Sequence, residues 1–223
     1  MSDSKPICRI GVFYDGSYFS YARRYFYRER SLGWLGYSPF QTLIEKYMSQ
    51  TEQGFSSYKI VYAAWFQGMF ASTQATAEQM KFDRNLYHDL MHAGIEPKYF
   101  PMSQAHGEKG IDVALAVDAL QAGLDDKIDI VVLVTGDADF VPLVRALMKE
   151  GKRVLAVYFD FKSEANGKSF INERLLNAVN YAIDINSLEG SKEFKSEFQR
   201  LFKTPSRTSP ASGIPPSKVK GPN

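Results

Sequence analysis

The stretch VVLVTGDADFVPLVRAL, residues 131–147, decides the fold class of this chain. It begins with an almost continuously apolar run, which is typical of a parallel strand that other elements cover on both faces. The run ends at Thr135 and Gly136, two acids follow as Asp137 and Asp139, and helix-like apolar spacing then resumes. A buried strand that passes directly into a helix favours an α/β domain with parallel strands.

The rest of the chain repeats this alternation of short apolar runs and longer helical patterns. We expect strands at 7–14, 58–66, 95–100, 129–135 and 153–159, and helices at 17–30, 39–50, 73–93, 110–124, 139–150 and 170–179. Strands that alternate with helices imply parallel pairing through right-handed crossovers. The sequence therefore predicts an α/β fold with a central, mostly parallel sheet of five to six strands flanked by helices.

Composition and the ends of the chain suggest one globular domain followed by a tail. The 223 residues are 44% apolar, and Cys8, the single cysteine, excludes an internal disulfide and is expected in the core. We find no signal peptide and no apolar run long enough to cross a membrane, so we expect no membrane partner and a cytoplasmic location. The expected units are a flexible start at 1–6, a domain at 7–187, a C-terminal helix at 188–202 and a disordered tail at 203–223, which holds five of the ten prolines and no acid.

Acids stand where two predicted strands end. Asp15 closes the first strand and Gly16 lets the chain turn sharply after it, while Asp137 and Asp139 follow the strand at 129–135. Ligands of open parallel sheets bind beyond the carboxyl ends of the strands. One helix N-cap, which stabilises by about 1 kcal/mol, accounts for only one of Asp137 and Asp139.

Another acid, Asp112, falls in the first turn of the predicted helix at 110–124. Asp118 comes six residues later, about 600° of helical rotation away, so it reaches the rim of the same edge or faces solvent. Carboxylates that converge repel one another unless a cation neutralises them. Mg²⁺ or Mn²⁺ suits such oxygen ligands and would support attack of water on a phosphodiester.

The segments FYDGSYF, KGIDVALAVDAL, VTGDADFVPLVRAL and GKRVLAVYF together resemble the NYN domain family, and more narrowly its LabA-like branch in the PIN-like nuclease superfamily. The resemblance spans about residues 7–187. It implies a PIN-like three-layer fold and a Mg²⁺- or Mn²⁺-dependent ribonuclease. Carried over by motif, the acids that act in catalysis and hold the metal would be Asp15, Asp112, Asp137 and Asp139.

Two positions depart from the family pattern. Tyr18 stands where the family commonly has the asparagine of an Asp-Gly-x-Asn block, so we expect a polar contact of the family to be missing, or replaced by a hydroxyl or by stacking on a base. Asn180 stands where many relatives carry an acid near the last strand.

The first helix, SYFSYARRYFYRER, combines arginines with aromatic residues around a predicted buried stripe of Phe19, Ala22 and Phe26. Arginines neutralise phosphates and aromatic rings stack on unpaired bases, so this surface suits single-stranded RNA, although it is equally a solvated helix over an aromatic core. A mobile lip is expected at 160–170. The candidate substrate contacts are Ser17, Tyr18, Arg23, Arg24, Lys109, Thr135 and Ser169.

Three functions remain open at this stage. The first is a metal-dependent ribonuclease that cleaves single-stranded RNA. The second is a catalytically weak or inactive module that binds RNA or a protein on the same fold. The third is an aspartyl-phosphate phosphohydrolase, which ranks last because its Asp-x-Asp pattern is absent after the first strand, where Asp15 is followed by Gly16 and Ser17. The oligomeric state stays open between a monomer and a homodimer.

Overall fold

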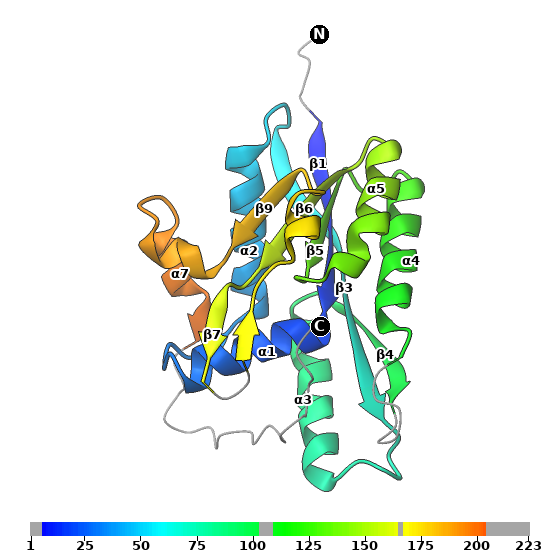
Figure 1. The fold of residues 1–223 in the computed structure, drawn as a ribbon, viewed down its shortest axis with the longest axis vertical. Coiled ribbons are helices and arrows are strands. Elements are labelled where there is room, and N and C mark those ends of the chain that lie inside the picture. The colour runs from blue at the N-terminus through cyan, green and yellow to red at the C-terminus, as the bar shows by residue number, and fades with distance from the viewer. Residues whose placement is uncertain (1–5, 103–108, 165–166, 204–223) are drawn as a thin grey trace.

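The computed structural model describes residues 6–102, 109–164 and 167–203, and its centre is a six-stranded sheet (Figure 1). All neighbouring strands of this sheet run parallel, in the order β4-β3-β1-β5-β6-β9. The strands are β1 (Ile7–Asp15), β3 (Ser57–Phe70), β4 (Glu96–Met102), β5 (Ile130–Val134), β6 (Arg153–Tyr158) and β9 (Tyr181–Asp184). The α/β architecture with parallel strands is confirmed.

Helices cover the sheet on both faces. They are α1 (Gly16–Arg28), α2 (Tyr37–Thr51), α3 (Ala77–His92), α4 (Ile111–Leu124), α5 (Val141–Lys149), α6 (Glu173–Leu176) and α7 (Lys195–Arg200), with two 3₁₀ turns, η1 (Ala138–Phe140) and η2 (Asn186–Gly190). In Figure 1, α4 and α5 lie together on one side of the sheet and α2 and α7 on the other. No described helix is long and apolar enough to cross a bilayer.

Alternate residues of the strands are buried in two separate hydrophobic cores, one on each face of the sheet. Tyr14, Trp65 and Phe19 belong to the core beneath α1 and α2, whereas Phe13, Phe66 and Leu133 belong to the core beneath α4 and α5. Every residue of β5 is buried, as expected of a central strand covered on both faces. Packing into these two cores therefore fixes how each strand is oriented in the sheet, and so the place at which the chain leaves the strand.

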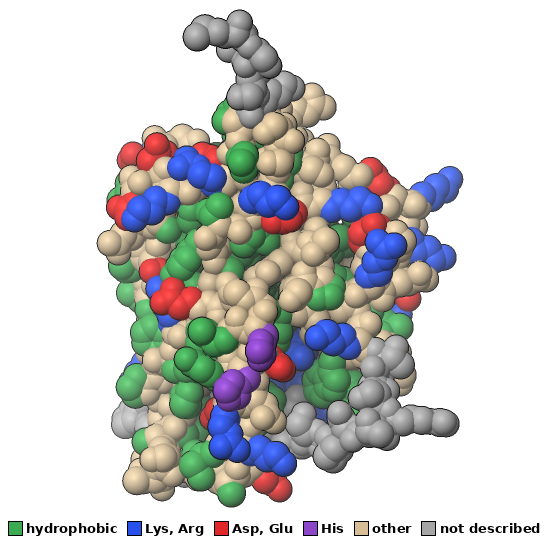
Figure 2. Space-filling view, turned by 180° about the vertical axis from the view of Figure 1, so that it is seen from behind, with side chains coloured by type: hydrophobic (Ala, Val, Ile, Leu, Met, Phe, Trp, Pro, Cys, Tyr) green, Lys and Arg blue, Asp and Glu red, His purple; other side chains and the backbone are tan. Residues whose placement is uncertain are grey.

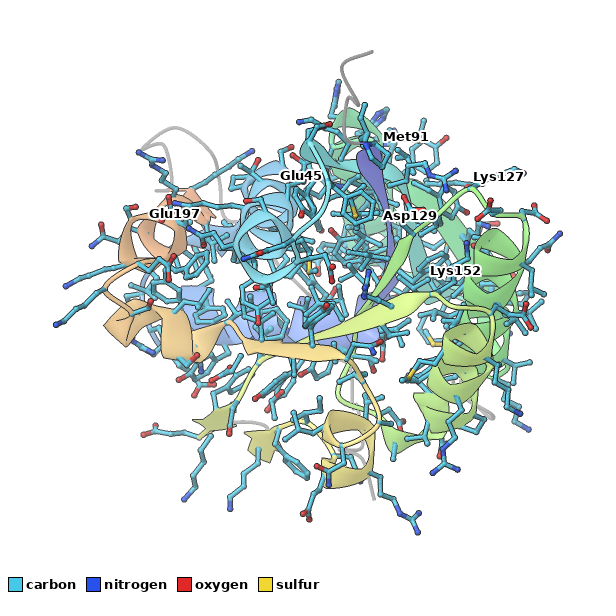
Figure 3. All side chains as sticks on the ribbon, turned by 90° about the horizontal axis from the view of Figure 1, so that it is seen from above. Glu45, Met91, Lys127, Asp129, Lys152 and Glu197 are labelled. Atoms are coloured by element: carbon cyan, nitrogen blue, oxygen red, sulfur yellow. The ribbon has the colours of Figure 1, made fainter. Side chains whose placement is uncertain are left out.

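The amino edge of the sheet is closed by ion pairs. The Arg9 guanidinium donates to both carboxylate oxygens of Asp129, at 2.7 and 3.1 Å, and Lys152 lies 2.6 Å from Asp126. Figure 3 looks onto this edge and shows Lys127, Asp129 and Lys152 gathered there. Because the charges at this end neutralise one another, the carboxyl edge is the place to look for chemistry. Cys8 is fully buried, as predicted.

The end of the domain differs from the predicted elements. The helix expected at 170–179 is only the four-residue α6, because Asn172 caps its start and the chain then turns to add β9 at the sheet edge. Asn180 supports this turn, since its Oδ1 accepts the Val154 amide at 2.8 Å. The expected helix at 188–202 is replaced by η2, α7 and β10 (Phe202–Lys203), which pairs with β2 (Trp34–Leu35). Residues 1–5 and 204–223 of the predicted start and tail lie outside the described residues.

The segment predicted as a lip forms a hairpin of β7 (Phe161–Ser163) and β8 (Gly167–Ser169) that packs on α1. The Phe161 ring stacks on Tyr25 with centroids 3.8 Å apart, and the Tyr21 hydroxyl donates to the Gly167 carbonyl at 3.1 Å. The Ser163 hydroxyl donates to Glu29 at 2.6 Å. The described part of this segment is therefore seated on the first helix rather than lying open over the sheet edge.

Candidate functional site

The carboxyl edge of the sheet carries an acid at or just after four of its six strands. Asp15 and Asp184 are the last residues of β1 and β9, Asp137 follows β5, and Asp160 follows β6. Parallel strands end at a common edge, so these acids share one end of the molecule. Asp160 and Asp184 were not among the predicted site residues. Asp160 follows the apolar run at 153–159 by the same pattern that singled out Asp15, whereas Asp184 ends a strand too short to give that pattern.

Asp15 joins β1 to α1. Its Oδ1 accepts the Tyr18 amide at 3.0 Å and so caps the helix, and the side chain is half-buried. Gly16 follows because no side chain fits there: a Cβ would lie 2.5 Å from the Trp65 indole nitrogen and 2.7 Å from the Phe66 carbonyl oxygen. This crowding explains why the strand ends in aspartate followed at once by glycine. The aspartate starts the helix, and the glycine lets the helix begin against the neighbouring strand.

Asp137 makes a similar turn after β5. Its Oδ1 accepts the Asp139 amide at 2.9 Å, and its own amide donates to the Thr135 hydroxyl at 3.3 Å. Thr135 is only 1% exposed, so it closes this turn and is not open to a substrate, contrary to the sequence interpretation. Gly136 is again required, since a Cβ would lie 2.4 Å from the Phe170 carbonyl oxygen. Asp15 and Asp137 therefore leave adjacent strands through the same kind of capped turn.

Asp139 is exposed and lines a cavity of about 860 Å³ between α5 and α6. Two arginines, Arg145 and Arg174, line the same cavity, yet within the described ranges neither lies within 4.0 Å of a carboxylate oxygen. Guanidinium groups without a carboxylate partner are suited to phosphate. Sequence analysis missed both, because single arginines on helices give no signal until the fold brings them beside an acid.

Asp112 lies in the first turn of α4 and is exposed. This helix contacts β1, β3 and η1, so it packs beside the turn that holds Asp137 and Asp139. Lys109 is exposed just before the helix, next to Gly110, whose φ of 73° suits glycine. The fold thus brings the elements that carry Asp15, Asp112, Asp137 and Asp139 together, as expected.

The side chains themselves do not form a closed metal cage. Across residues 6–102, 109–164 and 167–203, no three side chains of His, Cys, Asp or Glu are grouped closely enough to hold a metal ion. Mg²⁺ commonly keeps several waters and binds through one or two carboxylates together with substrate phosphates. The donor set at this edge fits such a water-rich ion, for which Asp15 and Asp137 would supply carboxylates that their capping hydrogen bonds hold in place.

Asp184 is held by three backbone amides, those of Asp160, Asn186 and Ser187, at 2.9 to 3.1 Å. Burial raises the pKa of Asp184 above its ordinary value, and the amides partly offset this effect. Its carboxylate therefore ties β9 to the loop after β6. This use accounts for both of its oxygens structurally.

Asp118 takes neither of the two positions expected for it. It accepts a hydrogen bond from the Tyr62 hydroxyl at 3.0 Å and forms an ion pair with Lys98 at 2.8 Å. Burial, followed by the neighbouring carboxylate of Glu96, raises the pKa of Tyr62, so the phenol stays protonated and donates. Asp118 therefore joins α4 to β3 and β4, and its contacts are structural.

Two of the expected substrate contacts, the half-buried Tyr18 and the buried Ser169, pack against other parts of the protein. The Tyr18 hydroxyl accepts the Phe159 amide at 3.0 Å, its ring packs 5.7 Å from the Phe159 ring, and burial raises its pKa. Ser169 is 5% exposed. Both expectations are corrected, because the hairpin of β7 and β8 covers this part of α1. Tyr18 is not presented as a surface on which a base can stack.

The arginines of α1 are less open to solvent than predicted. Arg23 lies over the rings of Tyr37 and Trp34, with its Cζ 4.5 and 5.3 Å from the two centroids. Arg24 is half-buried, and burial followed by the charge of Arg28 lowers its pKa. Phe19, Ala22 and Phe26 are buried, as predicted. Ser17 is half-buried in the first turn beside Asp15.

The fold and the edge define a class of protein: an α/β domain with a parallel six-stranded sheet and an acid-bearing carboxyl edge. A solved structure supports the fold, namely a protein of unknown function, VPA0982, from Vibrio parahaemolyticus RIMD 2210633. It superposes with a TM-score of 0.52 at 22% identity and covers 87% of this chain and 98% of that chain. At this identity the likeness shows the fold alone.

The profile of the NYN domain matches residues 9–186, so this chain belongs to the NYN domain family, a PIN-like nuclease family. A relative is the uncharacterized protein MJ0482 of Methanocaldococcus jannaschii, which is 29% identical over 114 residues. That match covers 51% of this chain, and it spans only 39% of the length of the relative.

Proposed function

We propose that this protein is a metal-dependent ribonuclease of the LabA-like branch that hydrolyses phosphodiester bonds of single-stranded RNA. Two aspartates that cap helices carry the proposal. Asp15 and Asp137 lie at the ends of the adjacent strands β1 and β5, in a chain of the NYN domain family. In this proposal Asp112 and Asp139 complete the acidic edge from α4 and η1.

A bound Mg²⁺ or Mn²⁺ ion would polarise the phosphoryl oxygens and lower the pKa of a water molecule at the edge. Asp15 and Asp137 would hold the ion, because their caps fix each carboxylate against the first turn of the element that follows. Arg145 and Arg174 would receive the phosphate from the side of Asp139. Guanidinium forks match phosphate oxygens in pairs and keep their charge at any working pH.

No side chain need act as a covalent nucleophile in the proposed reaction. Cys8 is fully buried near the start of β1, and burial raises the pKa of its thiol to about 12. Thiolates, rather than thiols, attack, so this residue stays inert. In the proposed reaction, water attacks the phosphodiester at the acidic edge in a single displacement.

A second function has its own support. The acids Asp15 and Asp137 both serve as helix caps, and the described side chains form no group of three metal ligands. These observations also suit a module that binds RNA or a protein without cleaving it. The two functions differ in what they need, since a nuclease requires the acids and a divalent metal, whereas a binding module tolerates their loss.

The experiment is an RNA cleavage assay with purified protein, mixed-sequence single-stranded RNA, and Mn²⁺ or Mg²⁺ with and without EDTA. Asp15→Asn and Asp137→Asn are the test variants, because asparagine caps a helix about as well as aspartate and so keeps the turns. Asp125→Asn is the matched control, an exposed acid at the end of α4 paired only with Lys127 among the described residues.

We expect cleavage that requires the metal, persists in Asp125→Asn and is lost in the other two variants. Removing a metal-binding carboxylate should lower the rate at least about a hundredfold. RNA binding without cleavage under either metal would favour the binding module instead. Cleavage that survives both Asp15→Asn and Asp137→Asn would show that the site lies elsewhere.

A further inference from the structure

A second cavity, of about 540 Å³, lies where α1, β2, the start of α2 and the end of α3 meet. The side chains that bring chemistry to it are Arg23, Trp34, Tyr37, Asp89, His92 and Lys203. Figure 2 shows this face, with a hollow next to the two purple histidines of α3 and lysine or arginine side chains recessed in it. None of the residues assigned to the acidic edge lines this cavity, and Arg23 is the one expected substrate contact that does.

Arg23 is one of the cations that line the cavity. One of its terminal nitrogens donates to the Tyr37 hydroxyl, and its guanidinium lies over two aromatic rings. Its Nε is buried and has no hydrogen-bond partner among the described residues, and no described carboxylate comes within 4.0 Å of its nitrogens. The described side chains therefore leave part of the donor capacity of this guanidinium unused, and an oxygen-bearing ligand on its terminal nitrogens suits it.

The other groups indicate what kind of oxygen-bearing ligand fits. Lys203 adds a second cation, while Asp89 is the single acid that lines the cavity among the described residues, so positive charge prevails. Trp34 is half-exposed, and one of its faces stacks on Tyr27 with centroids 4.1 Å apart and planes at 10°. A fixed aromatic ring beside two cations suits a base and its phosphate.

The cavity is within reach of the acidic edge. Arg23 and Asp15 are carried by the same helix, eight residues or about 12 Å apart along its axis. The aromatic contact between Tyr37 and Trp65, at 5.6 Å, joins the cavity to the position of Gly16, where a Cβ would touch the indole. The cavity lies on the face of the sheet opposite the Asp139 cavity, so a strand bound across the edge would meet it there.

We propose that this cavity binds a nucleoside monophosphate unit, with its phosphate on Arg23 and Lys203 and its base against Trp34. In the intact substrate this unit is the phosphorylated end of the RNA strand, so this part of the inference rests on the proposed function. A free nucleotide and the phosphorylated end of an RNA strand both present this nucleoside monophosphate unit. The test distinguishes these two ligands.

The test uses tryptophan fluorescence of the full chain in EDTA, so that binding is observed without cleavage. The protein has two tryptophans, of which Trp65 is fully buried and Trp34 lines the cavity, so Trp34→Phe shows whether the quenching comes from the cavity. The probes are AMP, adenosine, inorganic phosphate, and a short single-stranded RNA with and without a 5′-phosphate. We expect saturable quenching by AMP and by the phosphorylated RNA, with adenosine and unphosphorylated RNA at least about tenfold weaker.

Variants locate the binding. Arg23→Gln should weaken AMP at least about tenfold, Arg23→Lys should not restore it because lysine lacks the planar fork, and Trp34→Phe should remove the signal. Arg28→Gln is the matched control, an exposed arginine at the end of the same helix. Circular dichroism checks that each variant folds. If Arg23→Gln does not fold, Lys203→Ser, at an exposed position, must weaken AMP instead.

The outcomes separate this inference from the nuclease proposal. Preference for AMP over adenosine that is lost in Arg23→Gln supports the cavity even if the protein cleaves no RNA. Stronger binding of phosphorylated RNA than of AMP identifies the strand end as the ligand, and the reverse identifies a free nucleotide. Absence of saturable quenching by every probe, or equal quenching in Arg23→Gln and the unaltered protein, overturns the inference even if RNA cleavage is intact.

Discussion

Gly16→Ala tests whether the turn after β1 is as tightly built as the structure indicates. The added methyl group would lie 2.5 and 2.6 Å from Nε1 and Cε2 of Trp65 and 2.7 Å from the Phe66 carbonyl oxygen. Trp65 is fully buried, and its indole nitrogen donates to Gln67 at 2.9 Å, so the ring has little room to move. The Phe66 oxygen belongs to a strand paired directly with β1.

Overpacking a core typically costs about 1–3 kcal/mol, and contact with backbone and a fixed ring places this case near the upper end. The higher helix propensity of alanine compared with glycine offsets this cost by less than about 1 kcal/mol. We therefore expect a net loss of about 2 kcal/mol in the free energy of unfolding, which lowers the melting temperature by about 4–8 °C for a chain of this size. RNA cleavage should fall as well, because Asp15 is the next residue and would shift with the turn.

Urea unfolding followed by circular dichroism measures the loss. Gly190→Ala is the control, since nothing lies within 4 Å of its Cβ position and its φ is not positive. Trp65→Phe should be destabilising alone, but adding Gly16→Ala to it should cost at least about 1 kcal/mol less than in the unaltered protein. Equal stability of Gly16→Ala and Gly190→Ala would refute the reasoning and show that Trp65 yields.

Three further predictions follow from described contacts. Burial alone would raise the pKa of Asp129, but the hydrogen bonds and charge of Arg9 outweigh it, so the folded pKa lies below the ordinary value. The pair of Asp129 and Arg9 thus stabilises the fold above about pH 4, and this stabilisation is lost as pH falls through the folded pKa of Asp129. Asp129→Asn should therefore lower the free energy of unfolding in urea by about 1–3 kcal/mol at pH 7 and by much less near pH 2. Asp118→Asn should lower the melting temperature by breaking the ion pair with Lys98, yet leave RNA cleavage within about twofold; a large loss of cleavage would return Asp118 to the site. Asp15→Ala should lose about 1 kcal/mol of stability that Asp15→Asn retains, whereas cleavage should be lost in both, as thermal melts and the RNA assay would show.

The sequence predicted the central strands well because burial on both faces leaves a plain pattern. The run that became β5 is apolar at every position, and the turns after β1 and β5 carry an acid next to a glycine. β9 was missed, since a four-residue edge strand shows no such run and takes its place only by pairing with β6. Local pattern therefore sufficed in the middle of the sheet and failed at its edge.

The candidate site divides in the same way. The sequence placed Asp15 and Asp137 at strand ends, because a strand end is a local property. It misplaced Tyr18 and Asp118, whose partners lie 141 and 56 residues away in Phe159 and Tyr62. The direction in which a side chain points depends on such distant partners, and the spacing of residues along one helix does not reveal which partners those are.

The bond between the Tyr18 hydroxyl and the Phe159 amide has a consequence for any substitution at position 18. An asparagine at position 18 would be shorter than tyrosine, so its side chain could not reach as far as the phenol does. A change from tyrosine to asparagine alone would leave the Phe159 amide without its acceptor at the junction of β6 and β7. Substitution at position 18 should thus be inherited together with a rebuilt junction near residue 159, and grafting only one of the two between relatives should yield a less stable protein than grafting both.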